Sequence, residues 1–429
     1  MYLRAAKLQK SLERILTVFN FKFTKQEKNW IMYDVANSAY VLLATTIIPI
    51  LFSSIASGSL SKSDYLAYWG YAVTIATIVI AILSPILGAI SDSKGKRKPM
   101  FMIFLFIGII GCFLQPFAAS WLLFLIIFII TKIGFNGSLV FYDSMLTDVT
   151  TDDRMDEVSS HGYAWGYIGS CVPFIISILL VTKGEALLGI SMKTIMILVF
   201  LITGLWWLIF TLPLLKTYEQ KYYVENRSTN AKIVFKRLFK TLKEISSNRK
   251  IKHFLLAFFF YIDGVYTIIN MATAYGESLG LDSSGLILAL LATQIVAFPC
   301  AIIFGRISKK FKTETLIKIT IIAYGLITVF ATQLKNLPQF WILAILVGMF
   351  QGAIQALSRS YFAKIIPPEK SGEYFGIFDI FGKGASIFGT FLIAVVTDIT
   401  GKQNIALMTL VILFVIGYIT FSKCEKITE

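Results

Sequence analysis

Long apolar stretches recur along almost the whole chain, and they constrain its fold more than any other feature. A helix that crosses about 30 Å of hydrocarbon needs about 20 mainly apolar residues. Only 15% of the 429 residues are charged, whereas about 25% is usual in soluble domains. The pattern predicts an all-α, multi-pass membrane protein and excludes a soluble enzyme or a secreted disulfide scaffold. We expect twelve transmembrane helices, at residues 30–52, 66–90, 100–118, 120–141, 161–182, 194–215, 251–275, 284–304, 315–333, 339–360, 373–397 and 404–422.

A polar interruption from Lys216 to Lys250 divides the expected helices into two sets of six. The two halves resemble each other, because Phe135-Asn136-Gly137-Ser138 matches Phe350-Gln351-Gly352-Ala353 and Tyr33-Asp34 matches Ile262-Asp263. Such repeats are typical of transporters built from two related bundles around a central path. We therefore expect two pseudo-symmetric six-helix bundles. The expected parts are a basic amphipathic N-terminus (1–29), bundles at 30–215 and 251–422, a basic linker (216–250) and a tail (423–429).

Cationic residues are distributed unequally between the two sides of the expected membrane. The termini, the linker and the loops on their side carry 31 Lys and Arg, whereas the opposite loops carry five. By the positive-inside rule both termini are cytoplasmic. The N-terminus and the linker each place apolar residues on one helical face and cations opposite, which predicts surface helices on an anionic inner leaflet. For the N-terminus, a disordered basic tail is the alternative.

The net charge of +15 is therefore assigned to the membrane surface, and we do not expect nucleic-acid binding. Low-charge outer loops and the absence of eukaryotic targeting signals favour a bacterial plasma membrane.

Excluding residues near the span ends, six charged residues lie within the expected spans, where each costs about 2.5–3.5 kcal/mol at the bilayer centre and should face protein or water. Four of the six fall on the first, fourth, seventh and tenth spans, and the third, sixth, ninth and twelfth have none in their interiors. We infer that the first group lines a central cavity and that the second faces lipid. The expected substrate or coupling-ion residues are Asp34, Asn37, Lys132, Asn136, Asp263, Tyr266, Asn270, Gln351, Gln355 and Arg359.

Two of these residues lie closest to the middle of the membrane. We expect Asp263 to titrate or to bind a cation, and Lys132 to meet an anionic group of the substrate. Asp379 and Lys383 are four residues apart, so they share a helix face and can pair. An alternative stays open for these two residues and Arg359, since such charges can also serve only to hold the bundles together.

The loop after the second expected span contains the most specific short motif. Gly88-Ala-Ile-Ser-Asp92-Ser-Lys-Gly95-Lys96-Arg97 is similar to the signature of the major facilitator superfamily. Gly88 lets a neighbouring helix approach closely, Asp92 can meet a helix N-terminus or an arginine, and Gly95 permits the turn. We expect Lys96 and Arg97 to anchor at the cytoplasmic surface and the loop to act as a latch between the bundles.

Five stretches across both halves carry a more specific resemblance: residues 30–40, 141–146, 159–169, 355–360 and 373–376, the last followed by Gly382-Lys383. With them, nearly the whole chain resembles one branch of that superfamily, the vacuole effluxers first linked to autophagy and their bacterial relatives. The resemblance implies a twelve-helix facilitator and, for the vacuolar members, export of neutral amino acids.

These observations predict a secondary transporter that moves a small polar organic solute by alternating access, amino acids being the class that the resemblance suggests. A drug or metabolite exporter is one alternative, and a transporter-like receptor or scaffold that moves nothing is another. We expect no enzyme activity. An ATP-driven pump is not expected either, because Gly376 to Lys383 departs from the spacing of a phosphate-binding loop and the sequence contains no sizeable soluble domain. The four cysteines and two histidines are too far apart to predict a metal site. We expect no catalytic residue, no cofactor and a monomer.

Overall fold

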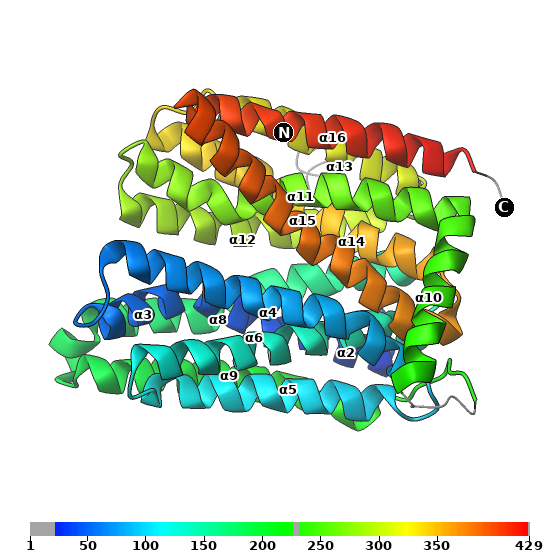
Figure 1. Cartoon of the computed structure of the whole chain (residues 1–429), viewed down its shortest axis with the longest axis horizontal. Helices are drawn as coiled ribbons and strands as arrows, with labels where there is room; N and C mark the ends of the chain where they lie inside the picture. Colours follow the sequence, from blue (N-terminus) through cyan, green and yellow to red (C-terminus); the bar gives the residue numbers. More distant parts are fainter. Residues whose placement is uncertain (1–21, 226–230, 428–429) are drawn as a thin grey trace, which may run out of the picture.

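The computed structural model of the chain describes residues 22–225 and 231–427, and helices make up nearly all of this part. Twelve helical segments in it are long and apolar enough to cross a membrane, which confirms the predicted all-helical, twelve-span fold. Figure 1 shows the helices of the first half, coloured blue to green, grouped beside those of the second half, coloured green to red. The elements are α2 (Lys25–Leu42), the π-helical η1 (Leu43–Ile47), α3 (Ile48–Ala56), α4 (Lys62–Ser91), α5 (Arg97–Leu114), η2 (Gln115–Phe117), α6 (Trp121–Ser144), α7 (Leu146–Val149), α8 (Met155–Leu188), α9 (Met192–Thr217), α10 (Ala231–Ser247), α11 (Arg249–Ser278), α12 (Ser283–Ile307), α13 (Thr313–Ala331), α14 (Leu337–Ile365), η3 (Pro368–Lys370), α15 (Ser371–Thr400) and α16 (Gln403–Glu425).

Polar residues begin many of these helices. The side chains of Ser61, Ser120 and Asn336 each accept a hydrogen bond from the backbone N–H three residues further on, which satisfies a donor that the first turn leaves free. A capped helix can extend beyond its predicted span: α4, capped by Ser61, begins at Lys62 rather than near residue 66. The predicted boundaries mark the apolar segment, whereas the helix continues into its polar surroundings.

Glycines let spanning helices of the same bundle pack closely. In the first bundle, α5 and α6 meet where a Cβ added to Gly134 would lie 2.4 Å from the backbone nitrogen of Gly108. In the second bundle, a Cβ added to Gly417 of α16 would lie 2.9 Å from the Cβ of Tyr261 on α11. Neither contact leaves room for a larger residue, so each bundle is a tightly packed body.

Helix α10 runs across one end of the two bundles (Figure 1), which we call the linker end. The amphipathic helix expected in the linker is therefore present. The start of α2 and the end of α16 lie at this end, where Glu27 pairs with Arg154 and the Cys424 thiol donates a hydrogen bond to the Lys250 carbonyl. The amphipathic helix expected in 1–29 falls mostly on residues 1–21, which lie outside the described part.

Equivalent hydrogen bonds in the two bundles give the register of the internal repeat. The hydroxyls of Tyr33 on α2 and Ser138 on α6 are 2.7 Å apart, and those of Tyr261 on α11 and Ser358 on α14 are also 2.7 Å apart. This correspondence aligns the residues that follow the tyrosines, Asp34 and Ile262, whereas the sequence match placed Asp34 opposite Asp263. It also aligns Ser138 with Ser358, whereas the sequence match placed Ser138 opposite Ala353. The matched stretches were too short to fix the register.

Candidate functional site

A cavity of about 420 Å³ lies between the two bundles. The lining comes from α2, α6 and α8 of the first half and from α11, α12, α14 and α15 of the second. None of the described residues of α5, α9, α13 or α16 contributes to it. Its polar and charged members are Asp34, Asn37, Ser38, Asn136, Asp143, Tyr163, Tyr167, Ser170, Tyr266, Asn270, Gln294, Gln351, Gln355, Arg359, Asp379 and Lys383.

Most of the residues that the sequence predicts for a substrate or ion site lie together in this cavity. Eight of the ten expected residues line it, namely Asp34, Asn37, Asn136, Tyr266, Asn270, Gln351, Gln355 and Arg359. The expected pair of Asp379 and Lys383 lines it as well. The polar residues that the sequence predicts on the cavity helices therefore make up most of the polar lining.

Lys132 and Asp263 lie outside the lining. The Asp263 carboxylate is fully buried and accepts hydrogen bonds from the Gly389 N–H at 2.8 Å and from the Thr267 hydroxyl at 3.4 Å, between α11 and α15 of the second bundle. The Lys132 ammonium lies 5.6 Å from the ring centre of Phe128 on the same helix, α6. Their depth in the membrane was evident from the sequence, but the helix face that each occupies was not.

Arg359 on α14 is the centre of an ion-pair network across the bundle boundary. Its guanidinium contacts the carboxylates of Asp34 at 3.3 Å and Asp143 at 3.0 Å. Its Nε donates to the Ser159 hydroxyl at 2.9 Å, and Nη2 donates to the Ser159 carbonyl at 3.1 Å. A planar guanidinium can satisfy several acceptors at once, so a single side chain of the second bundle joins α2, α6 and α8 of the first.

Aromatic rings hold this guanidinium in place. The Arg359 Cζ lies 4.6 Å from the ring centre of Trp30, 5.6 Å from that of Tyr142 and 4.4 Å from that of Tyr163. These distances are within the range of favourable cation–π contacts. Tyr142 also donates from its hydroxyl to the Asp34 carboxylate at 2.7 Å. The charges that face the cavity are therefore paired and oriented.

Helix α8 must come very close to this network. A Cβ on Gly162 would lie 2.2 Å from the Asp34 Oδ2 and 3.0 Å from the Arg359 Nη2. Any larger residue at position 162 would displace either α8 or the two ion-paired side chains. Gly162 belongs to a stretch that carried the family resemblance, and its role in this contact could not be inferred from that stretch alone.

The site prediction omitted Asp143 and Ser159. Both lie in the segment 142–160, which the hydropathy pattern assigned to a loop, whereas α6 continues to Ser144 and α8 begins at Met155. The family motifs could have identified both residues, because Asp143 lies in the stretch 141–146 and Ser159 in the stretch 159–169.

Asp379 and Lys383 form the expected pair within α15, with 2.6 Å between the ammonium and the carboxylate. Ser84 of α4 also donates to Asp379 at 2.8 Å. This hydrogen bond crosses the bundle boundary on the α4 side of the cavity. Three carboxylates and two cationic side chains thus line the cavity.

The predicted latch lies at the linker end, beyond the cavity. A Cβ on Gly88 would lie 2.1 Å from the Gly372 carbonyl oxygen, so α4 and α15 are in direct backbone contact. The Asp92 carboxylate accepts hydrogen bonds from the backbone N–H groups of Gly372 at 2.7 Å and Glu373 at 3.0 Å. These are free donors at the N-terminus of α15, where a negative charge is favoured. Gly95 turns the loop with a φ of 70°, a conformation that suits glycine.

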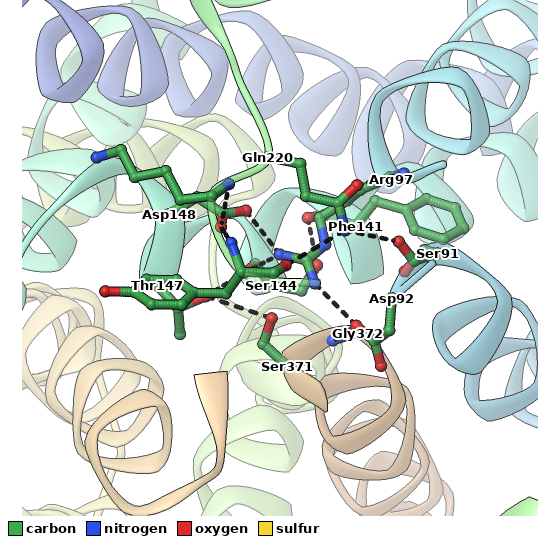
Figure 2. A network of polar contacts seen from close by, with 12 residues as sticks. Ser91, Asp92, Arg97, Phe141, Ser144, Thr147, Asp148, Gln220, Ser371 and Gly372 are labelled. Carbon is green, nitrogen blue, oxygen red and sulfur yellow. Dashed lines mark hydrogen bonds and ion pairs between the residues drawn. The ribbon is translucent and has the colours of Figure 1, made fainter. Parts of the chain in front are cut away.

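The prediction that Arg97 anchors at the surface is wrong. Figure 2 shows Arg97 between two carboxylates, with Asp92 2.8 Å and Asp148 2.6 Å from its guanidinium, and all three side chains are fully buried. Two buried acids compensate the buried cation, so the side chain does not need water. Lys96, the neighbouring residue of the motif, is exposed.

The second half forms the equivalent latch with reversed polarity. Its loop has Lys309 where the first half has Asp92, and the sequence therefore predicts an asymmetric pair of latches. The Lys309 ammonium lies 2.6 Å from Glu157, in the first turn of α8. Beside it, the Asp156 carboxylate accepts hydrogen bonds from Ser360 and Thr313, each at 2.6 Å. In the first latch the Asp92 carboxylate thus binds backbone amides, and in the second the Lys309 ammonium binds the Glu157 carboxylate.

Comparison with known proteins agrees with this arrangement. A family model described as "Vacuole effluxer Atg22 like" matches residues 24–425. The chain belongs to this Atg22-like family. The uncharacterized MFS-type transporter YxiO of Bacillus subtilis is 45% identical over 413 residues, which cover 95% of this chain and 96% of that protein. Autophagy-related protein 22 of Saccharomyces cerevisiae is 27% identical over 288 residues, which cover 58% of this chain and 54% of that protein. The chain thus spans about half the length of such fungal relatives.

Solved structures support the same fold. The chain superimposes on the major facilitator superfamily transporter FucP in its outward conformation with a TM-score of 0.72, at 14% identity, covering 96% of this chain and 100% of that one. The human organic anion transporter MFSD10 gives a TM-score of 0.71 at 13% identity, covering 93% and 100%. At these identities the similarity shows the fold alone. With the relatives, it makes this member of the Atg22-like family an integral membrane transporter of the major facilitator type and not an enzyme.

Proposed function

We propose that the protein is a secondary transporter that moves a small polar organic solute through the central cavity by alternating access. The observation that carries this proposal is the Arg359 network, because it joins the two bundles at the base of a polar cavity. A permanent bond between the bundles would close this path, whereas one that breaks and re-forms can gate it. A structural scaffold has no need for a cavity with sixteen polar or charged lining residues.

The lining favours a solute with both donors and acceptors. Besides its charges, the cavity presents six amide side chains, those of Asn37, Asn136, Asn270, Gln294, Gln351 and Gln355. An amide offers both a donor group and an acceptor oxygen. Three carboxylates against two cations also favour an ammonium group over a second anion. The size of the cavity is that of a small-molecule site, so amino acids are the first class to test.

The polar contacts that we describe between the bundles lie at the cavity or between it and the linker end. We infer that the linker end is closed in this arrangement and that opening it requires the Arg359 network and both latches to separate. Because the linker end carries most of the cations, we assign it to the cytoplasm of a bacterial plasma membrane. The arrangement would then be outward-facing. Transport of the solute would be either coupled to an ion gradient or uncoupled.

Counterflow in proteoliposomes tests the proposal. Proteoliposomes that contain the purified protein would be loaded with each unlabelled amino acid in turn. Uptake of the same amino acid in radiolabelled form would then be measured. We expect saturable exchange for at least one member of the panel. A panel of nucleosides and phosphorylated metabolites serves as the comparison, and exchange restricted to that panel would overturn the amino-acid assignment while leaving transport intact.

A matched pair of variants ties any exchange to the cavity. Asn270 lines the cavity with an exposed side chain. Asn270→Ala should weaken solute binding about two- to tenfold without lowering stability, since one lost hydrogen bond to a bound solute costs roughly 0.5–1.5 kcal/mol. Gln333 is exposed after α13, away from the cavity, and Gln333→Ala should change nothing. Equal exchange by all three proteins would contradict the placement of the solute in this cavity.

A further inference from the structure

Helix α10 contacts both bundles at the linker end. It packs on α4 of the first bundle and on α11 of the second, and its Thr241 and Ile245 are buried. Glu244 of α10 also forms an ion pair at 2.9 Å with Lys370, directly before α15. If the bundles separate at this end, α10 cannot keep all of these contacts.

The chain that leads into α10 is bound to the latch itself. The Asp148 carboxylate accepts hydrogen bonds from the backbone N–H groups of Lys221 and Tyr222, each at 3.0 Å. Further along, the Val224 N–H donates to the Asp92 carbonyl at 2.8 Å. Figure 2 shows Asp148 and Asp92 on either side of Arg97. The linker therefore shares its anchoring residues with the latch between α4 and α15.

The outer face of α10 is strongly basic. Lys236, Lys240 and Lys243 are exposed and recur at helical spacing on one side. Phe239 beside them is 71% exposed. A helix that lies across the ends of spanning helices, with lysines and an exposed aromatic ring, has the chemistry of a helix at a membrane interface. Anionic phospholipid headgroups are the partner that complements this charge at this depth.

We propose that α10 binds anionic phospholipid headgroups and that this binding stabilises the closed linker end. A ligand shifts a conformational equilibrium only by binding one state better than the other. With the linker end closed, contacts from both bundles hold α10 flat across it, and its three lysines face the same way. After separation, only one bundle holds the helix. The effect on the gate rests on the proposed alternating access.

The test measures the distance between the bundles directly. Spin labels at Asp152 and Lys310, which are exposed at the linker end on opposite bundles, would be introduced with Cys300 replaced by serine, and the pair would be measured by double electron–electron resonance. The protein would be placed in nanodiscs of phosphatidylcholine alone or of equal parts phosphatidylcholine and phosphatidylglycerol. We expect phosphatidylglycerol to enrich the short-distance population.

A charge-matched pair of variants identifies α10 as the cause. Each lysine near an anionic surface strengthens attachment by about fivefold, so replacing Lys236, Lys240 and Lys243 by glutamine should abolish the response to phosphatidylglycerol. The same replacement of three exposed lysines elsewhere at the linker end should preserve the response. These controls are Lys312, Lys423 and Lys426.

The outcomes separate the two proposals. An unchanged distance in the two lipids, or an equal response by the α10 variant, overturns the inference about lipid. If the same sample still shows two distance populations when a transported solute is added, the proposed function survives that failure. A linker end that stays closed in every lipid and with every solute contradicts alternating access as well.

Discussion

Replacing Gly88 by alanine should open the linker end without weakening either bundle. The three atoms closest to an added Cβ, at 2.1–3.2 Å, all belong to the backbone of Gly372 and Glu373 on α15. No rotation of a side chain can relieve this clash, so α15 must withdraw by at least about 1 Å. That movement also stretches the hydrogen bonds from Asp92, which are 2.7 and 3.0 Å long.

The cost falls on only one of the two conformations. Overpacking of this kind costs about 1–3 kcal/mol, and each strained hydrogen bond to a buried carboxylate adds to it. In the separated state α15 no longer faces Gly88, so the added methyl group meets nothing from the other bundle. A difference of about 2 kcal/mol changes the ratio of closed to open molecules about thirtyfold.

The distance between labels at Asp152 and Lys310 reports this shift, and Gly134→Ala provides the control. A Cβ on Gly134 would clash with the backbone of Gly108 at 2.4 Å, but within the first bundle. We therefore expect Gly134→Ala to lower the melting temperature without changing the distances, and Gly88→Ala to lengthen the distances at an unchanged melting temperature. If both variants lose stability equally and neither moves the labels, the reasoning from Gly88 is refuted.

Three further predictions concern charged residues. Arg359→Lys keeps the charge but loses the fork that joins Asp34, Asp143 and Ser159, so exchange in proteoliposomes should fall more than tenfold, and exchange like that of the wild type would contradict the gating role. Glu157→Lys should open the linker end in the distance measurement, and adding Lys309→Glu should restore closure, because the pair would re-form with its charges exchanged. Asp263→Asn keeps an acceptor for the Gly389 N–H and should fold normally; if Asp263 titrates or binds a cation, the pH or sodium dependence of uptake should disappear, and an unchanged dependence would refute that role.

The twelve spans and their division into two bundles could be predicted because the hydrocarbon imposes a length and a composition on each helix. The cost of an intramembrane charge likewise pointed to the helices that line the cavity. What hydropathy did not reveal was the face of each helix. Lys132 and Asn136 are one turn apart on α6, yet only Asn136 lines the cavity.

The parts that escaped prediction are those in which polar groups compensate one another. Segment 142–160 is too polar to be recognised as part of a span, yet Asp143, Asp156 and Glu157 within it form ion pairs across the bundle boundary. From the sequence, Arg97 is expected at the surface because the two acidic residues that pair with it lie in different segments. Asp92 is close to it in the sequence, whereas Asp148 is far from it. Such pairing is a property of the three-dimensional contact and cannot be inferred from either residue alone.

The chemistry of the contacts explains why the fold can divide along one boundary. Within a bundle, helices meet through glycines and aromatic rings, and separating them would expose apolar surface and close-packed backbone. Across the boundary at the linker end, α4 and α15 also meet closely, through Gly88 and Gly372. The polar partners there include Asp92 with backbone amides, Lys309 with Glu157, and Lys364 with Asp156 at 2.7 Å. Water can replace every one of these partners once the linker end opens, so the net cost of separation is far smaller than the strength of the bonds themselves. A boundary of this kind can be closed firmly and still open reversibly, which is what alternating access requires of it.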